Sequence, residues 1–208
     1  MPKITVSAAL LPFHTHAPET KPLTLRGSLQ AEPAPASNSL SLHVQWQIQG
    51  LATASPKLLL PLYPKTPSER YQLWEATCFE LFIASPTSEH YVEWNFALPH
   101  FYYQHFFVGY RQPLASGDAQ RLRSASPTPQ ALQSSYYATA DVWELTTQLS
   151  LPKATIDFLE LQETALVGIS CILVHPSPTE QKSYWAFAHP QAPLGPDFHA
   201  RQTWCQAV

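Results

Sequence analysis

Alternation of apolar and polar residues is the most frequent pattern along this chain, and it predicts β-strands. In one segment Val44, Trp46 and Ile48 share a face, and glutamines occupy the other face. The segment 143–149 repeats the pattern with tryptophan and leucines. The run 166–174 is apolar on both faces, which is typical of a central strand covered on both sides. Weaker strand candidates are residues 4–10, 23–30 and 136–140.

Prolines interrupt the chain at short intervals and leave little room for long helices. The chain has 21 prolines in 208 residues, about twice the usual share of roughly 5%. Proline is rare inside helices and central strands, so short strands and loops are expected. One short helix is expected at 155–161, after Pro152, and loops at 32–39 and 112–133. Neither loop has the length or bias of a linker, so the pattern predicts one mostly-β domain over residues 1–208.

The apolar positions of one hairpin predict its register. Its strands, 78–84 and 91–96, are joined by residues 85–90, and we expect Ala84 to pair with Tyr91. One face then carries six apolar side chains, in the opposed pairs Phe79–Phe96, Leu81–Trp94 and Ile83–Val92. A slip of one residue would turn all six to the wrong side, so the pattern fixes the register.

The opposite face of this hairpin is polar. Glu80 meets Asn95 there, and Glu93 and Tyr91 follow on the same side. Such a face is either solvated or lines a polar cavity. Aromatic and charged neighbours favour the cavity, and they are Trp74 and Glu75 before the hairpin and Tyr110 and Arg111 after it. The guanidinium among them could pair with the carboxylates, donate to a ligand, or do both.

The low content of charged residues argues against several classes of function. Charged residues make up 13% of the chain, about half of the usual share of roughly 25%, and the net charge of −3 is spread without runs. No basic stripe is present that would neutralise phosphates, so nucleic-acid binding is not expected. No stretch approaches the roughly 20 apolar residues of a membrane span, so no membrane partner is expected either.

The N-terminal residues and the cysteines favour a cytoplasmic protein. The short apolar run 8–11 is interrupted by proline and histidine, and it lacks the length of a signal-peptide core. Cys78, Cys171 and Cys205 are odd in number and widely spaced, unlike a disulfide framework or a zinc site. We therefore expect a reducing compartment, the cytoplasm.

Signatures of catalysis are weak. The sequence contains no H-E-x-x-H, G-x-S-x-G, P-loop or G-x-G-x-x-G pattern. Glu80 and Glu93 could act as the two carboxyls of a glycosidase, which lie roughly 5–9 Å apart, but any two glutamates on one sheet face meet this criterion. His189, Asp197 and His199 could form a metal or catalytic site. A loop stiffened by neighbouring prolines is the simpler account.

Several blocks of the chain, in order, resemble the bacterial DOMON-like proteins. The blocks are LWEATCFELF at 73–82, YVEWNF at 91–96, FVGYR at 107–111, YWAFAHP at 184–190 and PDFH at 196–199. These proteins are related to the family-nine carbohydrate-binding modules, and some accompany a cell-wall biosynthetic reductase. The resemblance implies an all-β, antiparallel β-sandwich of the jelly-roll-like, carbohydrate-binding-module type, whose concave face or rim holds a sugar or haem.

In sugar-binding relatives, aromatic rings stack on the sugar while carboxylate, amide and arginine groups bind its hydroxyls. The matching residues here are Trp74, Glu75, Glu80, Glu93, Asn95, Tyr110, Arg111 and Trp185, with His189, Asp197 and His199 as a candidate wall of the pocket. Trp74 and Trp185 could instead be core, since Trp185 lies in an alternating segment where either face could be inward.

Haem is not expected as a cofactor. Haem-binding relatives commonly use a methionine with a histidine or lysine as axial ligands, and the initiating Met1 is the sole methionine in this sequence. Ligation by two of the nine histidines stays open, but nothing in their spacing requires it. No metal or other cofactor is indicated.

Three functions remain, in order of preference. The first is non-catalytic binding of a small polar ligand, a carbohydrate or sugar-containing metabolite, in a cleft of the sandwich. The second is a glycoside-processing enzyme that uses Glu80 and Glu93. The third is an interaction module that binds a protein partner and no small molecule. A concave polar pocket would favour the first two, and an exposed apolar patch the third.

Overall fold

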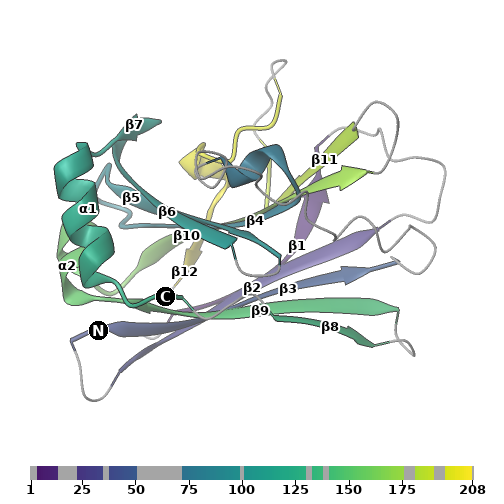
Figure 1. Cartoon of the computed structure of the whole chain (residues 1–208), viewed down its shortest axis with the longest axis horizontal. Helices are drawn as coiled ribbons and strands as arrows, with labels where there is room; N and C mark the ends of the chain where they lie inside the picture. Colours follow the sequence, from purple (N-terminus) through teal and green to yellow (C-terminus); the bar gives the residue numbers. More distant parts are fainter. Residues whose placement is uncertain are drawn as a thin grey trace.

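Two antiparallel β-sheets pack face to face in the computed structural model (Figure 1). The structure describes residues 4–13, 23–34, 38–50, 72–98, 101–129, 133–137, 141–175, 181–189 and 195–207. All strand pairs are antiparallel, which confirms the predicted all-β sandwich.

The two sheets are joined through the first strand. Sheet A consists, in spatial order, of β1 (Ile4–Pro12), β2 (Thr24–Pro33), β3 (Leu40–Gln49), β9 (Val142–Leu151) and β8 (Gln133–Tyr137). Sheet B consists of β7 (Gln112–Pro113), β6 (Phe101–Gly109), β5 (Tyr91–Ala97), β4 (Cys78–Ala84), β10 (Ala165–His175) and β11 (Gln181–Ala186), and β12 (Cys205–Ala207) pairs with β10. The end of β1, at Leu11 and Pro12, leaves sheet A and pairs with β11 of sheet B.

Most of the predicted strands are present. Residues 4–10 lie in β1, all but the first residue of 23–30 lie in β2, and 166–174 lies in β10 between β4 and β11. The candidate at 136–140 is shifted, because β8 covers 133–137, and residues 138–140 lie outside the described part of the chain. No helix in the described ranges is long and apolar enough to cross a membrane.

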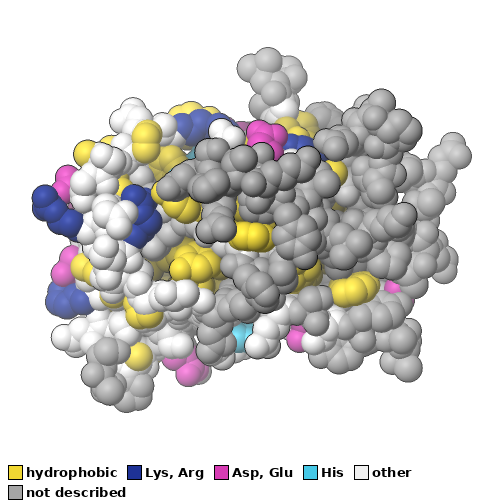
Figure 2. All heavy atoms as spheres, in the orientation of Figure 1, with side chains coloured by type: hydrophobic (Ala, Val, Ile, Leu, Met, Phe, Trp, Pro, Cys, Tyr) yellow, Lys and Arg dark blue, Asp and Glu magenta, His cyan; other side chains and the backbone are white. Residues whose placement is uncertain are grey.

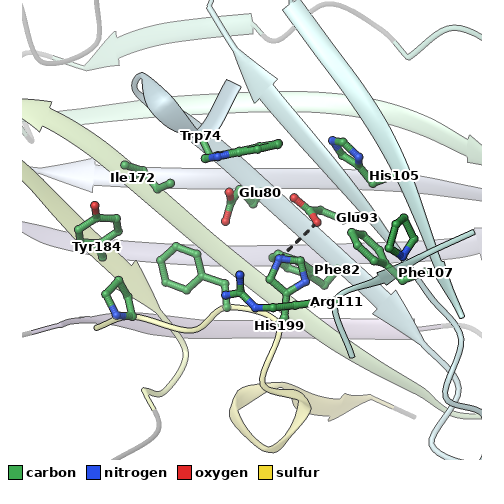
Figure 3. A pocket seen from close by; sticks show the side chains of 13 residues that line it. Trp74, Glu80, Phe82, Glu93, His105, Phe107, Arg111, Ile172, Tyr184 and His199 are labelled. Atoms are coloured by element: carbon green, nitrogen blue, oxygen red, sulfur yellow. Dashed lines mark ion pairs between the residues drawn. The ribbon is translucent and has the colours of Figure 1, made fainter. Parts of the chain in front are cut away.

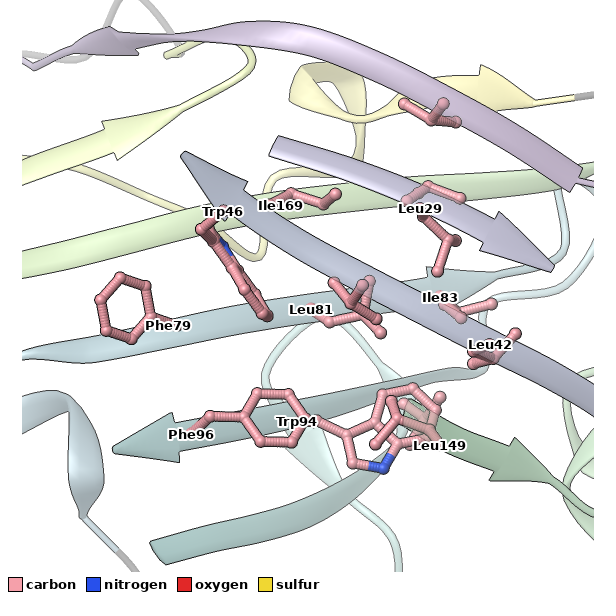
Figure 4. Close-up of a cluster of buried hydrophobic side chains, with 14 of the residues drawn as sticks. Leu29, Leu42, Trp46, Phe79, Leu81, Ile83, Trp94, Phe96, Leu149 and Ile169 are labelled. Carbon is pink, nitrogen blue, oxygen red and sulfur yellow. The ribbon is translucent and has the colours of Figure 1, made fainter. Parts of the chain in front are cut away.

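Trp46 fills the centre of the core between the sheets (Figure 4). Its ring meets those of Phe79 and Phe96 at steep angles, with centroids 5.6 and 5.9 Å away. Its indole Nε1 donates to the carbonyl oxygen of Ser170 at 3.2 Å, so the buried N–H is satisfied. The other apolar residues of the alternating β3 face are buried with it, which confirms the predicted orientation of that strand.

The predicted register of the β4–β5 hairpin is confirmed. Ala84 pairs with Tyr91, and the six apolar residues of one face form the expected opposed pairs. That face packs into the core between the sheets. The polar residues therefore lie on the other side, which we call the outer face of sheet B. Both strands are buried along their whole length, so the outer face is covered as well.

Two helices lie at one end of the sandwich (Figure 1). The shorter, α2 (Lys153–Phe158), follows Pro152 as predicted, but it begins and ends earlier than the predicted range 155–161. The longer, α1 (Ser116–Ala125), contradicts the predicted loop at 112–133. Gly117 and the flanking prolines give this segment the sequence pattern of a loop. Leu122 nevertheless packs against the core and anchors one face of the helix. On the face that Figure 2 shows, basic side chains at this end are interspersed with acidic ones, without a basic stripe.

Close approach of the sheets at Gly27 gives the first testable prediction. A Cβ atom at this position of β2 would lie 2.5 Å from Cγ2 of Ile169 in β10. Gly27→Ala should therefore lower the free energy of unfolding by about 1–3 kcal/mol, through overpacking. Urea unfolding followed by tryptophan fluorescence measures this loss.

Two further variants control this experiment. Gly117→Ala should not destabilise the chain, because a Cβ there meets nothing within 4 Å. Adding Ile169→Ala to Gly27→Ala should cost less than the sum of the two single changes, because it removes the contacted methyl group. Equal losses for Gly27→Ala and Gly117→Ala, or strict additivity, would contradict close packing at this point.

Candidate functional site

The outer face of sheet B holds a cavity of about 450 Å³ (Figure 3). The sheet supplies its floor because side chains of one parity on each strand point outward. Glu80 comes from β4, Glu93 from β5, His105 from β6, Ile172 from β10 and Tyr184 from β11. These residues are neighbours across the strand pairing and not along the chain, so the register of the sheet assembles them.

Two segments outside the sheet form the walls. The 3-10 helix η3 (Leu73–Glu75) brings Trp74 to one side, where its ring lies 5.7 Å from that of His105. The C-terminal segment 195–204 brings Pro196, Phe198 and His199 to the opposite side. In Figure 3 the two glutamate carboxyls lie between Trp74 and His199.

A glycine allows the C-terminal segment to lie close to the sheet. Gly168 of β10 faces outward, and a Cβ there would lie 2.7 Å from Cδ1 of Trp204. Trp204 stacks on Phe82 at 5.4 Å, and its Nε1 donates to the carbonyl oxygen of Phe198 at 2.8 Å. Arg201 donates from its guanidinium to two carbonyl oxygens of the β4–β5 turn. These contacts fix the segment that carries His199.

The two carboxyl groups are almost completely removed from solvent. Glu80 is 3% exposed and Glu93 is 4% exposed. Oε2 of Glu80 accepts from the Ser170 hydroxyl at 2.6 Å, and Oε1 of Glu93 accepts from Nδ2 of Asn95 at 2.6 Å. Each carboxyl therefore has one oxygen held by the protein, while both groups line the cavity.

Burial raises the pKa of both glutamates. The pKa of Glu80 rises to about 8, chiefly by desolvation and further by the charge of Glu93, against the hydrogen bond from Ser170. The pKa of Glu93 rises to about 7, again by desolvation, against the hydrogen bond from Asn95 and the charge of Arg111. Both carboxyls thus hold protons at pH values where a solvated glutamate has lost its own.

His199 is neutral and is held at the wall of the cavity by Tyr91. The Tyr91 hydroxyl accepts from the Arg111 backbone N–H at 3.1 Å, and its oxygen is hydrogen-bonded to Nδ1 of His199 at 2.7 Å. The other ring nitrogen, Nε2, lies 3.8 Å from Oε2 of Glu93. Burial lowers the pKa of His199 to about 4, and the charge of Arg111 adds to this.

Arg111 is paired with an aspartate at the rim of the cavity. Its Nη2 donates to Oδ1 of Asp197 at 3.0 Å, and the Tyr110 hydroxyl donates to Oδ2 at 2.6 Å. Arg111 has a left-handed backbone (φ 52°), which is unfavourable for a residue with a Cβ. Its backbone hydrogen bond to Tyr91 helps to hold that conformation. The positive charge is therefore already balanced by Asp197.

The predicted site residues are only partly brought together. Five of them line the cavity, and these are Trp74, Glu80, Glu93, Arg111 and His199. Three support the lining, because Asn95 is fully buried against Glu93, and Tyr110 and Asp197 hold Arg111. The other three, Glu75, Trp185 and His189, are not among the lining residues.

The position of the Trp185 side chain differs from the expected one. It lies in the core cluster between the sheets, because it pairs with Cys171, whose side chain faces inward, and its Nε1 donates to the Ser183 hydroxyl at 3.0 Å. The residue before it, Tyr184, has the opposite parity and lines the cavity. The expectation that both tryptophans face one cleft is therefore wrong for Trp185.

Glu75 and His189 also point elsewhere. Glu75 is exposed and forms an ion pair with Lys182 at 2.9 Å, on the outer side of η3. Nε2 of His189 lies 2.8 Å from the carbonyl oxygen of Leu11, where it joins the C-terminal part of the chain to β1. Neither contact reaches the cavity floor.

Sequence reasoning missed eight of the lining residues. They are Phe82, His105, Phe107, Pro113, Ile172, Tyr184, Pro196 and Phe198. Part of this set could have been found by extending the hairpin register, because β6 places His105 opposite Glu93 and Phe107 opposite Tyr91. The residues of the C-terminal segment carry no such periodic signal.

The possible metal-ligating side chains of the site do not suggest a metal centre. Among the described residues, no group of three or more histidine, cysteine, aspartate or glutamate side chains is placed to hold a metal ion. The buried carboxyls and the neutral imidazole instead form a constellation suited to hydrogen bonding.

Comparisons with known proteins add one structure. No protein-family model matches the chain, and no curated protein matches it. A similar solved structure is that of a protein from Bacteroides uniformis ATCC 8492, provisionally described as carbohydrate-binding. The TM-score is 0.47 at 14% sequence identity, and the match covers 95% of this chain and 84% of that chain. The candidate site is therefore inferred from the residues of this chain alone.

The raised pKa values predict how stability depends on pH. Between pH 6.5 and their folded pKa values of about 8 and 7, Glu80 and Glu93 keep protons in the folded chain that the unfolded chain has lost. The free energy of unfolding should fall as pH rises from 6.5 to 8, by up to about 1.4 kcal/mol per pH unit for each retained proton. Below this window His199 acts in the opposite direction, since its folded pKa of about 4 lies below the unfolded value of 6.5.

Urea unfolding at several pH values checks this prediction. The double variant Glu80→Gln/Glu93→Gln should give a flatter profile between pH 6.5 and 8, because neither amide titrates. Glu144→Gln, on sheet A, is the matched control and should keep the slope of the unmodified chain. A slope that is the same in the double variant and the unmodified chain would show that the two carboxyls are solvated.

Proposed function

We propose that the chain binds a small polyhydroxylated ligand, a sugar or sugar-containing metabolite, in the outer cavity of sheet B and leaves it chemically unchanged. The observation that carries this proposal is the combination of buried carboxyls and aromatic walls in one cavity of about 450 Å³. Pockets for small molecules usually measure roughly 300–1,000 Å³. The resemblance of the chain to DOMON-like, carbohydrate-binding-module relatives supports the same proposal.

The chemistry of the lining suits a sugar. Trp74 and Phe198 offer ring surface for the apolar side of a pyranose, and Trp74 adds an indole N–H. A protonated carboxyl both donates and accepts a hydrogen bond, as a sugar hydroxyl does. Glu80 and Glu93 can therefore pair with neighbouring hydroxyls of one ligand. The imidazole of His199 adds a further hydrogen-bonding group at the cavity wall.

Glycoside hydrolysis is the weaker candidate. A glycosidase needs carboxyls in different states, one ionised as base or nucleophile and one protonated as acid, so their environments push the two pKa values apart. Here the same cause, burial, raises the pKa of both Glu80 and Glu93. With pKa values of about 7 and 8, Glu93 is ionised only in part at neutral pH and Glu80 is mostly protonated, so the two states are not clearly separated. This lack of divergence favours binding over catalysis.

A protein-interaction surface is also less well supported. Within the described residues, the exposed large apolar side chains are those of Leu11, Tyr102 and Tyr110. Leu11 lies in β1, Tyr102 lies near the start of β6, and Tyr110 follows the end of β6. Interaction surfaces are usually marked by larger exposed apolar areas.

Trp74→Ala tests the binding site. A sugar at about one hundred times its dissociation constant should stabilise the unmodified chain by about 2.7 kcal/mol, which raises Tm by several degrees. The variant should bind about tenfold more weakly or worse, because it loses the stacking surface. Calorimetric titration of sugars identified in a thermal-shift screen measures both affinities.

Tyr102→Ala is the matched control for this test. Tyr102 is an exposed aromatic residue that does not line the outer cavity of sheet B, so its removal should leave the affinity unchanged. The proposal fails if no sugar raises the Tm of the unmodified chain, or if Trp74→Ala retains full affinity. Release of p-nitrophenol from p-nitrophenyl glycosides, abolished by Glu93→Gln, would instead establish hydrolysis.

A further inference from the structure

Within the described ranges, the acidic pair in the cavity forms no ion pair with a lysine or arginine. Neither Glu80 nor Glu93 lies within ion-pair distance of such a side chain. Arg111 lines the cavity and its charge acts on both carboxyls, but its guanidinium is paired with Asp197 at 3.0 Å. Lys182, which lies close to Trp74, is paired with Glu75 at 2.9 Å.

His199 does not supply the missing positive charge. It lies 3.8 Å from Glu93, but its ring is largely buried, and burial lowers its pKa to about 4, so the ring is neutral. Buried carboxylates without a counter-charge are strongly unfavourable. The acidic pair consequently stays neutral by keeping its protons, and the cavity can accept a positive charge in exchange for a proton.

We propose that the ligand itself carries this charge, and that the cavity is specific for an amino-bearing polyol such as an amino sugar. This inference rests on the proposed function and names its ligand class. The ammonium would lie between the carboxyls of Glu80 and Glu93, and the sugar ring would lie against the aromatic walls. Each ammonium that enters displaces a proton from a carboxyl to solvent, so charge balances.

The aromatic lining favours a cation as well. The face of a tryptophan, tyrosine or phenylalanine ring attracts an ammonium within about 6 Å of its centroid, most strongly when the site is dry. Trp74, Tyr184 and Phe198 present such rings around the acidic pair. A phosphate or carboxylate on the ligand would instead meet two acids and an arginine already neutralised by Asp197. Anionic sugars should therefore be excluded.

Calorimetric titration with four probes tests the inference. Glucosamine carries the amine, glucose lacks it, N-acetylglucosamine has a neutral amide in its place, and choline is a cation without a sugar ring. Near pH 6.5, where both acids hold protons, glucosamine should bind at least about tenfold more tightly than glucose or N-acetylglucosamine. Repeating the titration in buffers of different ionisation enthalpy should show release of about one proton per glucosamine.

Three glutamate variants locate the effect. Glu80→Gln or Glu93→Gln should remove most of the preference for glucosamine, while glucose affinity changes by less than about threefold, because an amide still binds hydroxyls. Glu144→Gln makes the same substitution on sheet A, away from the cavity, and should preserve the preference. Thermal unfolding of each variant shows whether it has folded.

The outcomes separate this inference from the proposed function. If glucose and N-acetylglucosamine bind as tightly as glucosamine, the charge inference is overturned and sugar binding stands. If choline binds with proton release and no sugar binds, the cavity recognises a cation, but both the amino-sugar ligand class and the proposed sugar binding are overturned. If neither glucosamine nor choline binds, the charge inference is overturned. Retention of the preference in both Glu80→Gln and Glu93→Gln would also overturn it.

Discussion

The pairing register of β4 and β5 is the constraint on which the core and the cavity both depend. In this register one face of the hairpin packs against Trp46 between the sheets, while the other carries Glu80, Glu93 and Asn95 outward. A shift by one residue would bury the carboxyls in the apolar core and expose the aromatic residues. The apolar face therefore determines where the acids lie, and the free energy of core packing offsets the cost of keeping them out of water.

The segments that cover the outer face of sheet B turn a polar sheet surface into a buried site. Trp204 lies against Gly168 and stacks on Phe82, and this anchors the segment that brings His199 over the carboxyls. With solvent excluded, the acids hold their protons instead of ionising, and each keeps one oxygen bonded to the protein. Structure and protonation state are thus linked. The segments that close the cavity keep the carboxyls out of solvent, and the buried carboxyls then hold their protons until a ligand supplies a positive charge.

The sequence predicts the parts of the molecule that are periodic. The hairpin places strong apolar residues at alternate positions on both strands, so the register and the outward direction of Glu80 and Glu93 could be derived before the structure. Trp185 could not be placed in this way, because aromatic residues of both parities occur in β11. Its pairing with Cys171 of β10, a long-range contact, determines that it faces the core.

Non-periodic elements account for the remaining differences. The helix α1 contains few apolar residues, and Leu122 contacts a core built from distant segments, so local pattern gives it no signal. The wall formed by Phe198 and His199 depends on a glycine in β10 that lies far away in the sequence. Such tertiary contacts override local propensity, and the sequence pattern does not reveal them.

The central claim is that the cavity holds two protonated glutamates when no ligand is bound. The most direct measurement is a titration of the side-chain carboxyl 13C resonances by NMR without ligand, with Glu80→Gln and Glu93→Gln used to assign the two signals. The account predicts that both carboxyls titrate well above the ordinary value of 4.5, near 7 to 8. Two resonances that titrate near 4.5 would contradict it, because they would show solvated carboxylates and an open polar surface.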